Sequence, residues 1–217
     1  MSVETLKATY PWPDVSSIRA WDYTLGGQGR HLVDSIILSL PANPVMIEIG
    51  CFLGASAKRW LQLRDDLTLI GLDRWDDRLV DISKRYVGRP ALTRAYPDIA
   101  VQEQFVSDIE SQTPYMTCLA NLQDYKDRFI PVRGNSPEGL YEIAKTGVKA
   151  DLVYIDAGKK RDDLEVSHEL WPQAHITGDD WHWGRTRDFP MRQVVNGFAQ
   201  DYGFAVEADH ATWILKR

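Results

Sequence analysis

Apolar and polar stretches alternate along the chain in lengths typical of strands and helices. An apolar, β-branched run at 45–49 follows Pro44 and predicts a buried strand. Gly50 and Gly54 lie in the turn that follows, and they allow sharp backbone bends and a close ligand approach. The next run, 55–63, predicts a helix. Such a strand, glycine turn and helix form the unit that cradles a nucleotide-like cofactor in α/β folds.

The same alternation continues to the end of the chain. Further strands are expected at 68–73, 129–132, 151–156, 175–178, 204–207 and 212–215. Further helices are expected at 32–40, 137–144, 162–170 and 191–202. Alternating strands and helices indicate an α/β fold of the doubly wound, Rossmann-like kind, with helices on both faces of a mainly parallel sheet. The whole chain, 1–217, is expected to form one domain.

Two segments do not belong to this alternation. Residues 1–28 contain Pro-Trp-Pro and Gly-Gly and are expected to form an irregular N-terminal arm. Residues 74–128 are longer than a crossover needs and are interpreted as an insertion. Within it, apolar spacing predicts two short helices, around 101–109 and 115–125. The insertion is expected to form a lid or a homodimer contact, and the sequence does not choose between them.

Composition narrows the partners and the compartment. The net charge of −6 argues against general nucleic-acid binding, although it leaves room for a local basic pocket. Two cysteines make no disulfide framework and fit a reducing compartment. No leader-like start and no membrane-spanning apolar run is seen in the sequence. We therefore expect a cytoplasmic protein without nucleic-acid or membrane partners.

Acidic residues close three of the predicted strands. Asp73 ends the second strand, where a carboxylate can accept bonds from ribose hydroxyls. The alternative is a surface aspartate in a turn. Asp156 ends the fourth strand, and the pair Asp179 and Asp180 ends the fifth. Ligands of doubly wound folds bind at these carboxyl ends, and three carboxylates there are hard oxygen ligands suited to Mg²⁺ or Mn²⁺. Each acid alone also has an ordinary explanation as a turn or cap residue.

Residues 48–56 read Glu-Ile-Gly-Cys-Phe-Leu-Gly-Ala-Ser, which resembles the first motif of class I S-adenosylmethionine-dependent methyltransferases. The spacing G-x-x-x-G differs from the G-x-G-x-x-G of dinucleotide binders, so a nicotinamide oxidoreductase is less favoured. The resemblance implies S-adenosylmethionine as cofactor and a seven-stranded sheet of order 3-2-1-4-5-7-6 with an antiparallel last strand. The cofactor-binding residues that it implies are Glu48, Gly50, Gly54, Ser56, Asp73, Asn135, Ser136 and Asp156. For Ser136, capping of the following helix explains the residue as well.

Two motifs point to different subfamilies. The order Asp156-Ala-Gly-Lys159 resembles the catechol and caffeoyl-CoA O-methyltransferases, in which the acid binds metal and the lysine takes the hydroxyl proton. The sequence Gly-Asp-Asp that ends at Asp180 resembles bacterial methyltransferases acting on sugars and antibiotics. The mixture leaves the acceptor open. It also leaves the base open among Lys159, Lys160 and His182.

These observations predict a small-molecule O-methyltransferase that is assisted by Mg²⁺ or Mn²⁺ bound to Asp156, Asp179 and Asp180, with Lys159 as the catalytic base. Three tryptophans beside the motifs are expected either to line the acceptor-binding site or to pack in the core: Trp75, Trp181 and Trp183. One alternative is a sugar-hydroxyl methyltransferase with a histidine or aspartate base. The other is a protein that binds S-adenosylmethionine without catalysis.

Overall fold

A central sheet organises the computed structural model, which describes residues 3–21 and 28–217. Its seven strands have the order β3-β2-β1-β4-β5-β7-β6. The strands are β1 (Val45–Ile49), β2 (Thr68–Asp73), β3 (Phe129–Arg133), β4 (Leu152–Ile155), β5 (His175–Gly178), β6 (Ala205–Asp209) and β7 (Thr212–Lys216). The strands β1 to β5 pair in parallel, whereas β7 runs antiparallel to both β5 and β6. The predicted fold class, strand order and antiparallel last strand are confirmed.

The central strands are apolar because both faces of the sheet are covered. Ile47 and Val153 are register partners in β1 and β4 and are fully buried in the core on one face. Met46 and Tyr154 point to the other face and belong to a second buried cluster. Successive strand side chains alternate between faces, so a strand covered on both sides reads as a continuous apolar run.

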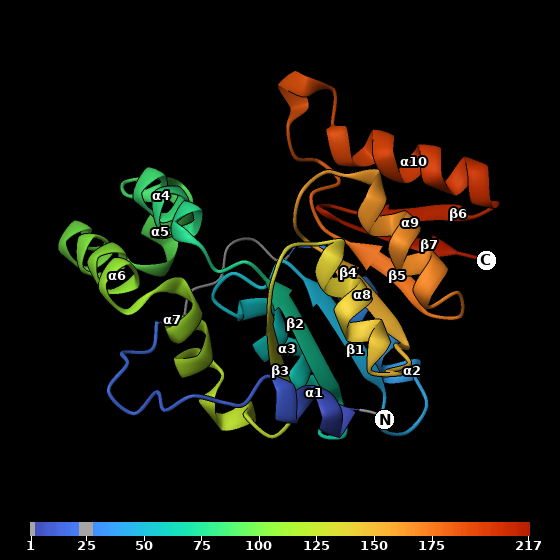
Figure 1. Cartoon of the computed structure of the whole chain (residues 1–217). Helices are drawn as coiled ribbons and strands as arrows, with labels where there is room; N and C mark the ends of the chain where they lie inside the picture. Colours follow the sequence, from blue (N-terminus) through green and yellow to red (C-terminus); the bar gives the residue numbers. More distant parts are fainter. Residues whose placement is uncertain (1–2, 22–27) are drawn as a thin grey trace.

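Helices cover both faces, as predicted (Figure 1). One face is covered by α2 (His31–Ser39), α3 (Ala55–Leu63) and α7 (Pro114–Asn121). The other is covered by α8 (Glu138–Lys145), α9 (Arg161–Leu170) and α10 (Pro190–Tyr202). In the described parts of the chain, no helix combines the length and the apolar character needed to cross a bilayer.

The insertion is more helical than predicted. It holds α4 (Asp77–Tyr86), α5 (Pro90–Ala95), α6 (Ile99–Gln112), α7 and the 3₁₀ turn η1 (Gln123–Tyr125). Only α6 and α7 were predicted. The start of α4 is fixed by Asp76, whose side chain accepts a hydrogen bond from the backbone N–H of Arg78. Val80, Leu92 and Phe105 pack in a small core that also includes Trp21 and Leu53 from outside the insertion. Figure 1 shows α4, α5 and α6 as one group beside the sheet.

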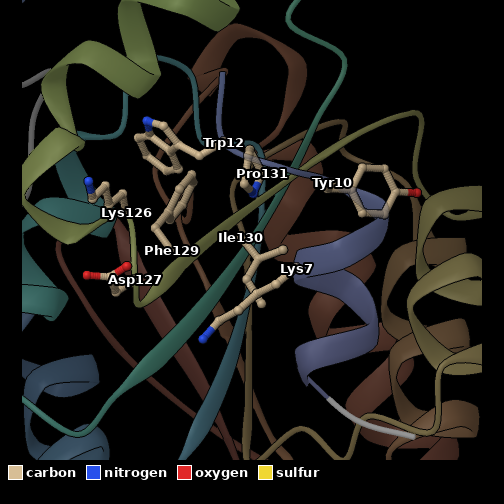
Figure 2. A pocket seen from close by; sticks show the side chains of 8 residues that line it. All are labelled: Lys7, Tyr10, Trp12, Lys126, Asp127, Phe129, Ile130 and Pro131. Atoms are coloured by element: carbon tan, nitrogen blue, oxygen red, sulfur yellow. The ribbon is translucent and has the colours of Figure 1, made fainter. Parts of the chain in front are cut away.

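The prediction of an irregular N-terminal arm is partly wrong. Residues 3–9 form α1 (Val3–Thr9), because Leu6 is buried in the main core. A hollow of about 110 Å³ lies beside this segment, and Trp12, which lines it, lies edge-on to Phe129. Figure 2 shows the side chains that line it. That volume is below the roughly 300 Å³ typical of ligand sites. The Gly-Gly pair of the predicted arm lies outside the described residues.

Candidate functional site

The glycine turn after β1 has the geometry that only glycine accepts easily. Gly50 has φ of 91°, and a Cβ there would lie 2.2 Å from the backbone oxygen of Asp156. Gly54 has φ of 80° at the start of α3, where a Cβ would lie 2.7 Å from Leu122 Cδ1. The turn therefore brings the ends of β1 and β4 into close approach, at the carboxyl edge of the sheet.

A cavity of about 850 Å³ opens at this edge. Six of the eight predicted cofactor residues line it: Gly50, Ser56, Asp73, Asn135, Ser136 and Asp156. The other two, Glu48 and Gly54, are not among its described lining residues. Glu48 is fully buried, and the hydroxyl of Ser56 donates a hydrogen bond to its Oε1. Glu48 therefore contacts a residue that lines the cavity, Ser56, but does not line the cavity itself. Gly54 belongs to the turn before α3.

Two backbone N–H groups hold the carboxylate of Asp73. Its Oδ1 accepts from the N–H of Trp75 and its Oδ2 from the N–H of Phe52, both at 2.9 Å. Burial raises the pKa of the Asp73 carboxyl, and the backbone bonds oppose that rise. Each carboxylate oxygen keeps lone pairs for a second donor, as ribose hydroxyls would require. Trp75 is itself buried and donates from Nε1 to the oxygen of Phe52 at 2.7 Å, so it supports the turn and walls no acceptor.

The segment after β3 also lines the cavity, but it starts its helix differently from the prediction. Helix α8 begins at Glu138, after Pro137, and no side chain caps it. Ser136 therefore does not serve as the predicted cap. Asp163 of α9 is fully buried and lines the same cavity. Burial raises the pKa of its carboxyl. Sequence reasoning missed Asp163, which is one of several acids at a helix start.

The strand-end acids do come together, because β4 and β5 are parallel neighbours in register at Ile155 and Gly178. Asp156, Asp179 and Asp180 all line the cavity. Burial is the main cause that raises the pKa of Asp156 well above its ordinary value, and the two nearby acids add to it. The expected convergence of three carboxylates is therefore present.

A buried arginine lies among these acids. Arg30 precedes α2 and is 7% exposed. Its Nη2 is 3.4 Å from Asp179 Oδ2 and 3.8 Å from Asp156 Oδ2, so one guanidinium is shared by two carboxylates. The charges around it raise the pKa of Arg30, although burial opposes this. Sequence reasoning missed Arg30, because no motif surrounds it.

The three base candidates lie in different surroundings. Lys159 Nζ donates to the Asp180 carboxylate and, at 2.8 Å, to the backbone oxygen of Ala157. Lys160 lines the cavity, but no ion pair joins it to another described residue. His182 Nδ1 lies 2.8 Å from Arg192 Nη2, and His182 is not among the described lining residues. Lys159 is thus the candidate in contact with the strand-end acids.

Two of the tryptophans that were predicted to line the acceptor site lie in different places. Trp183 lines the cavity, with Lys159 Nζ 5.0 Å from its ring centroid and Arg187 Cζ 4.1 Å from it. Trp181 instead packs against the core and carries the guanidinium of Arg192 at 5.0 Å. Across the cavity, α4 contributes Arg78 and other residues to the lining. The insertion therefore forms one wall of the site.

A divalent ion at the strand ends would need carboxylate oxygens that are free to coordinate it. Carboxylate oxygens suit Mg²⁺ or Mn²⁺. However, Arg30 already bridges Asp156 and Asp179, and Lys159 already binds Asp180. Over residues 3–21 and 28–217, no group of three or more acidic, histidine or cysteine side chains is arranged to hold a metal. The donor set suits a metal, but this arrangement of the residues does not fit one.

Comparisons with known proteins give a fold but no close relative. No protein-family model matches the chain, and no curated protein is significantly similar to it in sequence. A crystallised Staphylococcus aureus protein, provisionally named a caffeoyl-CoA O-methyltransferase, is 16% identical, with a TM-score of 0.55 over 99% of this chain and 91% of its own. A precorrin-6Y C5,15-methyltransferase from Geobacter metallireducens is 16% identical, with a TM-score of 0.52 over 95% of this chain and 96% of its own.

An O-methyltransferase from Bacillus cereus, solved in complex with S-adenosylhomocysteine, is 18% identical. Its TM-score is 0.50, over 99% of this chain and 89% of its own. Together with the strand order and the antiparallel β7, these likenesses identify the fold. This chain has the Rossmann-like fold of the class I S-adenosylmethionine-dependent methyltransferases.

Proposed function

We propose that this protein is an S-adenosylmethionine-dependent O-methyltransferase that acts on a hydroxyl group of a small molecule. One observation carries the proposal. A single cavity joins the glycine turn and Asp73 to the cluster of Asp156, Lys159 and Asp180. A cofactor subsite and a proton-accepting group thus face the same space. The O-methyltransferase names of two structural neighbours agree with this assignment.

The chain's own residues suit the cofactor. Asp73 would accept hydrogen bonds from the ribose, because its position is fixed by two backbone N–H groups. Gly50 would let the ligand approach the backbone closely, and Asn135 and Ser136 would lie against the adenine. When bound, the sulfonium cofactor supplies an activated methyl group. The protein's task is then to orient the acceptor and to take its proton.

We assign proton removal to the Lys159–Asp180 pair. The pair is neutral overall when the amine is protonated and the carboxylate ionised. As the acceptor oxygen forms its bond to the methyl carbon, the carbon–sulfur bond breaks and its electrons stay on sulfur. The hydroxyl proton passes to the pair, either onto Asp180 directly or onto Lys159 after its own proton has moved to Asp180. The pair gains one positive charge as the sulfonium loses one, so the charges balance.

Two alternatives remain distinguishable from this proposal. A sugar-hydroxyl acceptor with an aspartate base would use the same pair, whereas a His182 base is disfavoured because that ring is hydrogen-bonded to Arg192 and is not among the described lining residues. A binding protein without catalysis would have no use for a proton acceptor beside the cofactor subsite. Metal assistance stays a prediction from the sequence, and no step here is assigned to a metal.

Calorimetry tests the cofactor first. S-adenosylhomocysteine should bind and NAD should not. Transfer of an isotope-labelled methyl group from S-adenosylmethionine should then be measured with catechols, vicinal diols, monohydroxy compounds and sugars. Binding of NAD in preference to S-adenosylhomocysteine would refute the proposal. Cofactor binding without methyl transfer to any of the four acceptor classes would favour the non-catalytic alternative.

A further inference from the structure

Arg30 and Lys159 occupy the places around the strand-end acids where the sequence predicted a metal. We propose that these two side-chain cations replace a divalent metal, so that Arg30 positions Asp156 and Asp179 and the site works without a bound ion. The inference rests on the proposed function, since it concerns the same cavity. It departs from the metal dependence that the sequence motifs predicted.

Charge balance supports the replacement. When all three carboxylates are ionised they carry three negative charges, and Arg30 and Lys159 together supply the two positive charges that one divalent ion would supply. A metal added to this cluster would lie within a few ångströms of a guanidinium that cannot release its proton. The repulsion would be weakly screened, because Arg30 is buried. Metal binding therefore requires that Arg30 first leave its carboxylates.

The position of Arg30 is itself determined by the fold. Helix α2 begins directly after Arg30, and Val33 and Ile37 of that helix are fully buried against the sheet. The guanidinium is thus carried on an anchored segment and reaches Asp179 from 149 positions away in the sequence. A planar guanidinium with several fixed donors can hold two carboxylates in place at once. This is a positioning role that a divalent ion otherwise performs.

The replacement changes what the site asks of an acceptor. A metal centre selects acceptors with two neighbouring oxygens, because both can coordinate the ion. A site organised by Arg30 and Lys159 needs one hydroxyl within reach of the Lys159–Asp180 pair. Monohydroxy acceptors should therefore be methylated without the disadvantage that a chelating site imposes on them.

Manganese binding tests the inference without any knowledge of the acceptor. The electron paramagnetic resonance signal of free Mn²⁺ is followed as wild-type protein, Asp179→Asn and Arg30→Gln are added. Arg30→Lys tests whether a positive charge alone is sufficient. Arg59→Gln is the matched control, because Arg59 pairs with Asp34 and is not among the described lining residues. S-adenosylhomocysteine calorimetry runs in parallel as the check on the proposed function.

We expect wild-type protein, Arg59→Gln and Arg30→Lys to bind no Mn²⁺ that depends on Asp179. Arg30→Gln should gain at least about tenfold in Mn²⁺ affinity, because one positive charge has left the cluster. Methyl transfer by wild-type protein should be unchanged by a chelator, and it should fall in Arg30→Gln more than in Arg30→Lys.

Wild-type Mn²⁺ binding that is lost in Asp179→Asn would overturn the inference, and so would loss of activity in chelator that Mg²⁺ restores. These two results need no variant of Arg30, so they decide the matter even where Arg30→Gln fails to fold. Unchanged Mn²⁺ affinity in folded Arg30→Gln would also overturn it. Failure of S-adenosylhomocysteine to bind would instead refute the proposed function, and the calorimetry keeps the two failures apart.

Discussion

Replacing Glu48 by glutamine should change how the protein's stability depends on pH. Glu48 is fully buried, and burial raises the pKa of its carboxyl to about 7, from an ordinary value of 4.5. The hydroxyl of Ser56 donates to Oε1, whereas Oε2 has no hydrogen-bond partner among the described residues. Glutamine keeps the size and an acceptor for Ser56, and it removes the titration.

The direction and the size of this pH dependence follow from the difference in proton binding between the folded and unfolded states. An acid whose pKa is raised by folding holds its proton more tightly in the folded state. Between about pH 4.5 and about pH 7 the unfolded chain has lost a proton that the folded protein keeps, so the free energy of unfolding falls by about 1.4 kcal/mol per pH unit. Between about pH 5 and about pH 8.5 the expected loss is about 2.5 kcal/mol. The Glu48→Gln variant should not show this loss.

Urea unfolding at the two pH values measures this change in the free energy of unfolding. The quantity of interest is the wild-type change with pH minus the change in Glu48→Gln, because costs that do not depend on pH cancel in this difference. Glu142→Gln is the control, since Glu142 is exposed and pairs with Lys145 on the surface. A difference near zero for Glu48→Gln, or one equal to that of the control, would refute the argument from burial.

Two further predictions concern the cavity. Asp73→Asn should weaken S-adenosylhomocysteine binding by about 10- to 150-fold in calorimetry, because bonds to an ionised acceptor contribute about 1.5–3 kcal/mol. Unchanged affinity would remove Asp73 from the cofactor subsite. Lys159→Met should lower kcat by about 10²–10⁴-fold with little change in cofactor affinity, the usual contribution of a positioned base. Lys160→Met is its control, and equal losses at both positions would indicate general electrostatics.

Most of the sheet could be predicted because buried parallel strands leave a clear apolar signal. The predicted bounds of β1 and β2 agree with the structure, and those of β3 and β7 differ by one residue. Short helices held by few buried side chains were harder. In α1 only Leu6 is buried among seven residues, and in α4 only Val80 and Ser83 are buried among ten. Neither gives the long apolar stripe by which a helix is recognised.

The sequence predicted the parts of the site that lie at strand ends. It did not predict the contacts between segments that are distant in the sequence. Asp156 and Asp179 were expected to converge because parallel neighbours end at one edge, and they do. Arg30 lies 149 positions before Asp179, so no spacing within a local stretch of sequence predicts their contact. The contact of Lys159 with Asp180 is similar, because it depends on how the loops after β4 and β5 fold toward each other.

Arg30 also connects the chemistry of the site to its stability. Its charge lowers the pKa of Glu48 and of Asp156, in each case against the effect of burial. Removing one partner from a buried ion pair is costly, because the remaining charge is left unpaired in a medium that solvates it poorly. Lys159, by contrast, forms its ion pair with Asp180 alone among the acids that the structure describes. A change at Arg30 should therefore disturb Glu48, Asp156 and Asp179 together, whereas a change at Lys159 should act mainly on proton transfer.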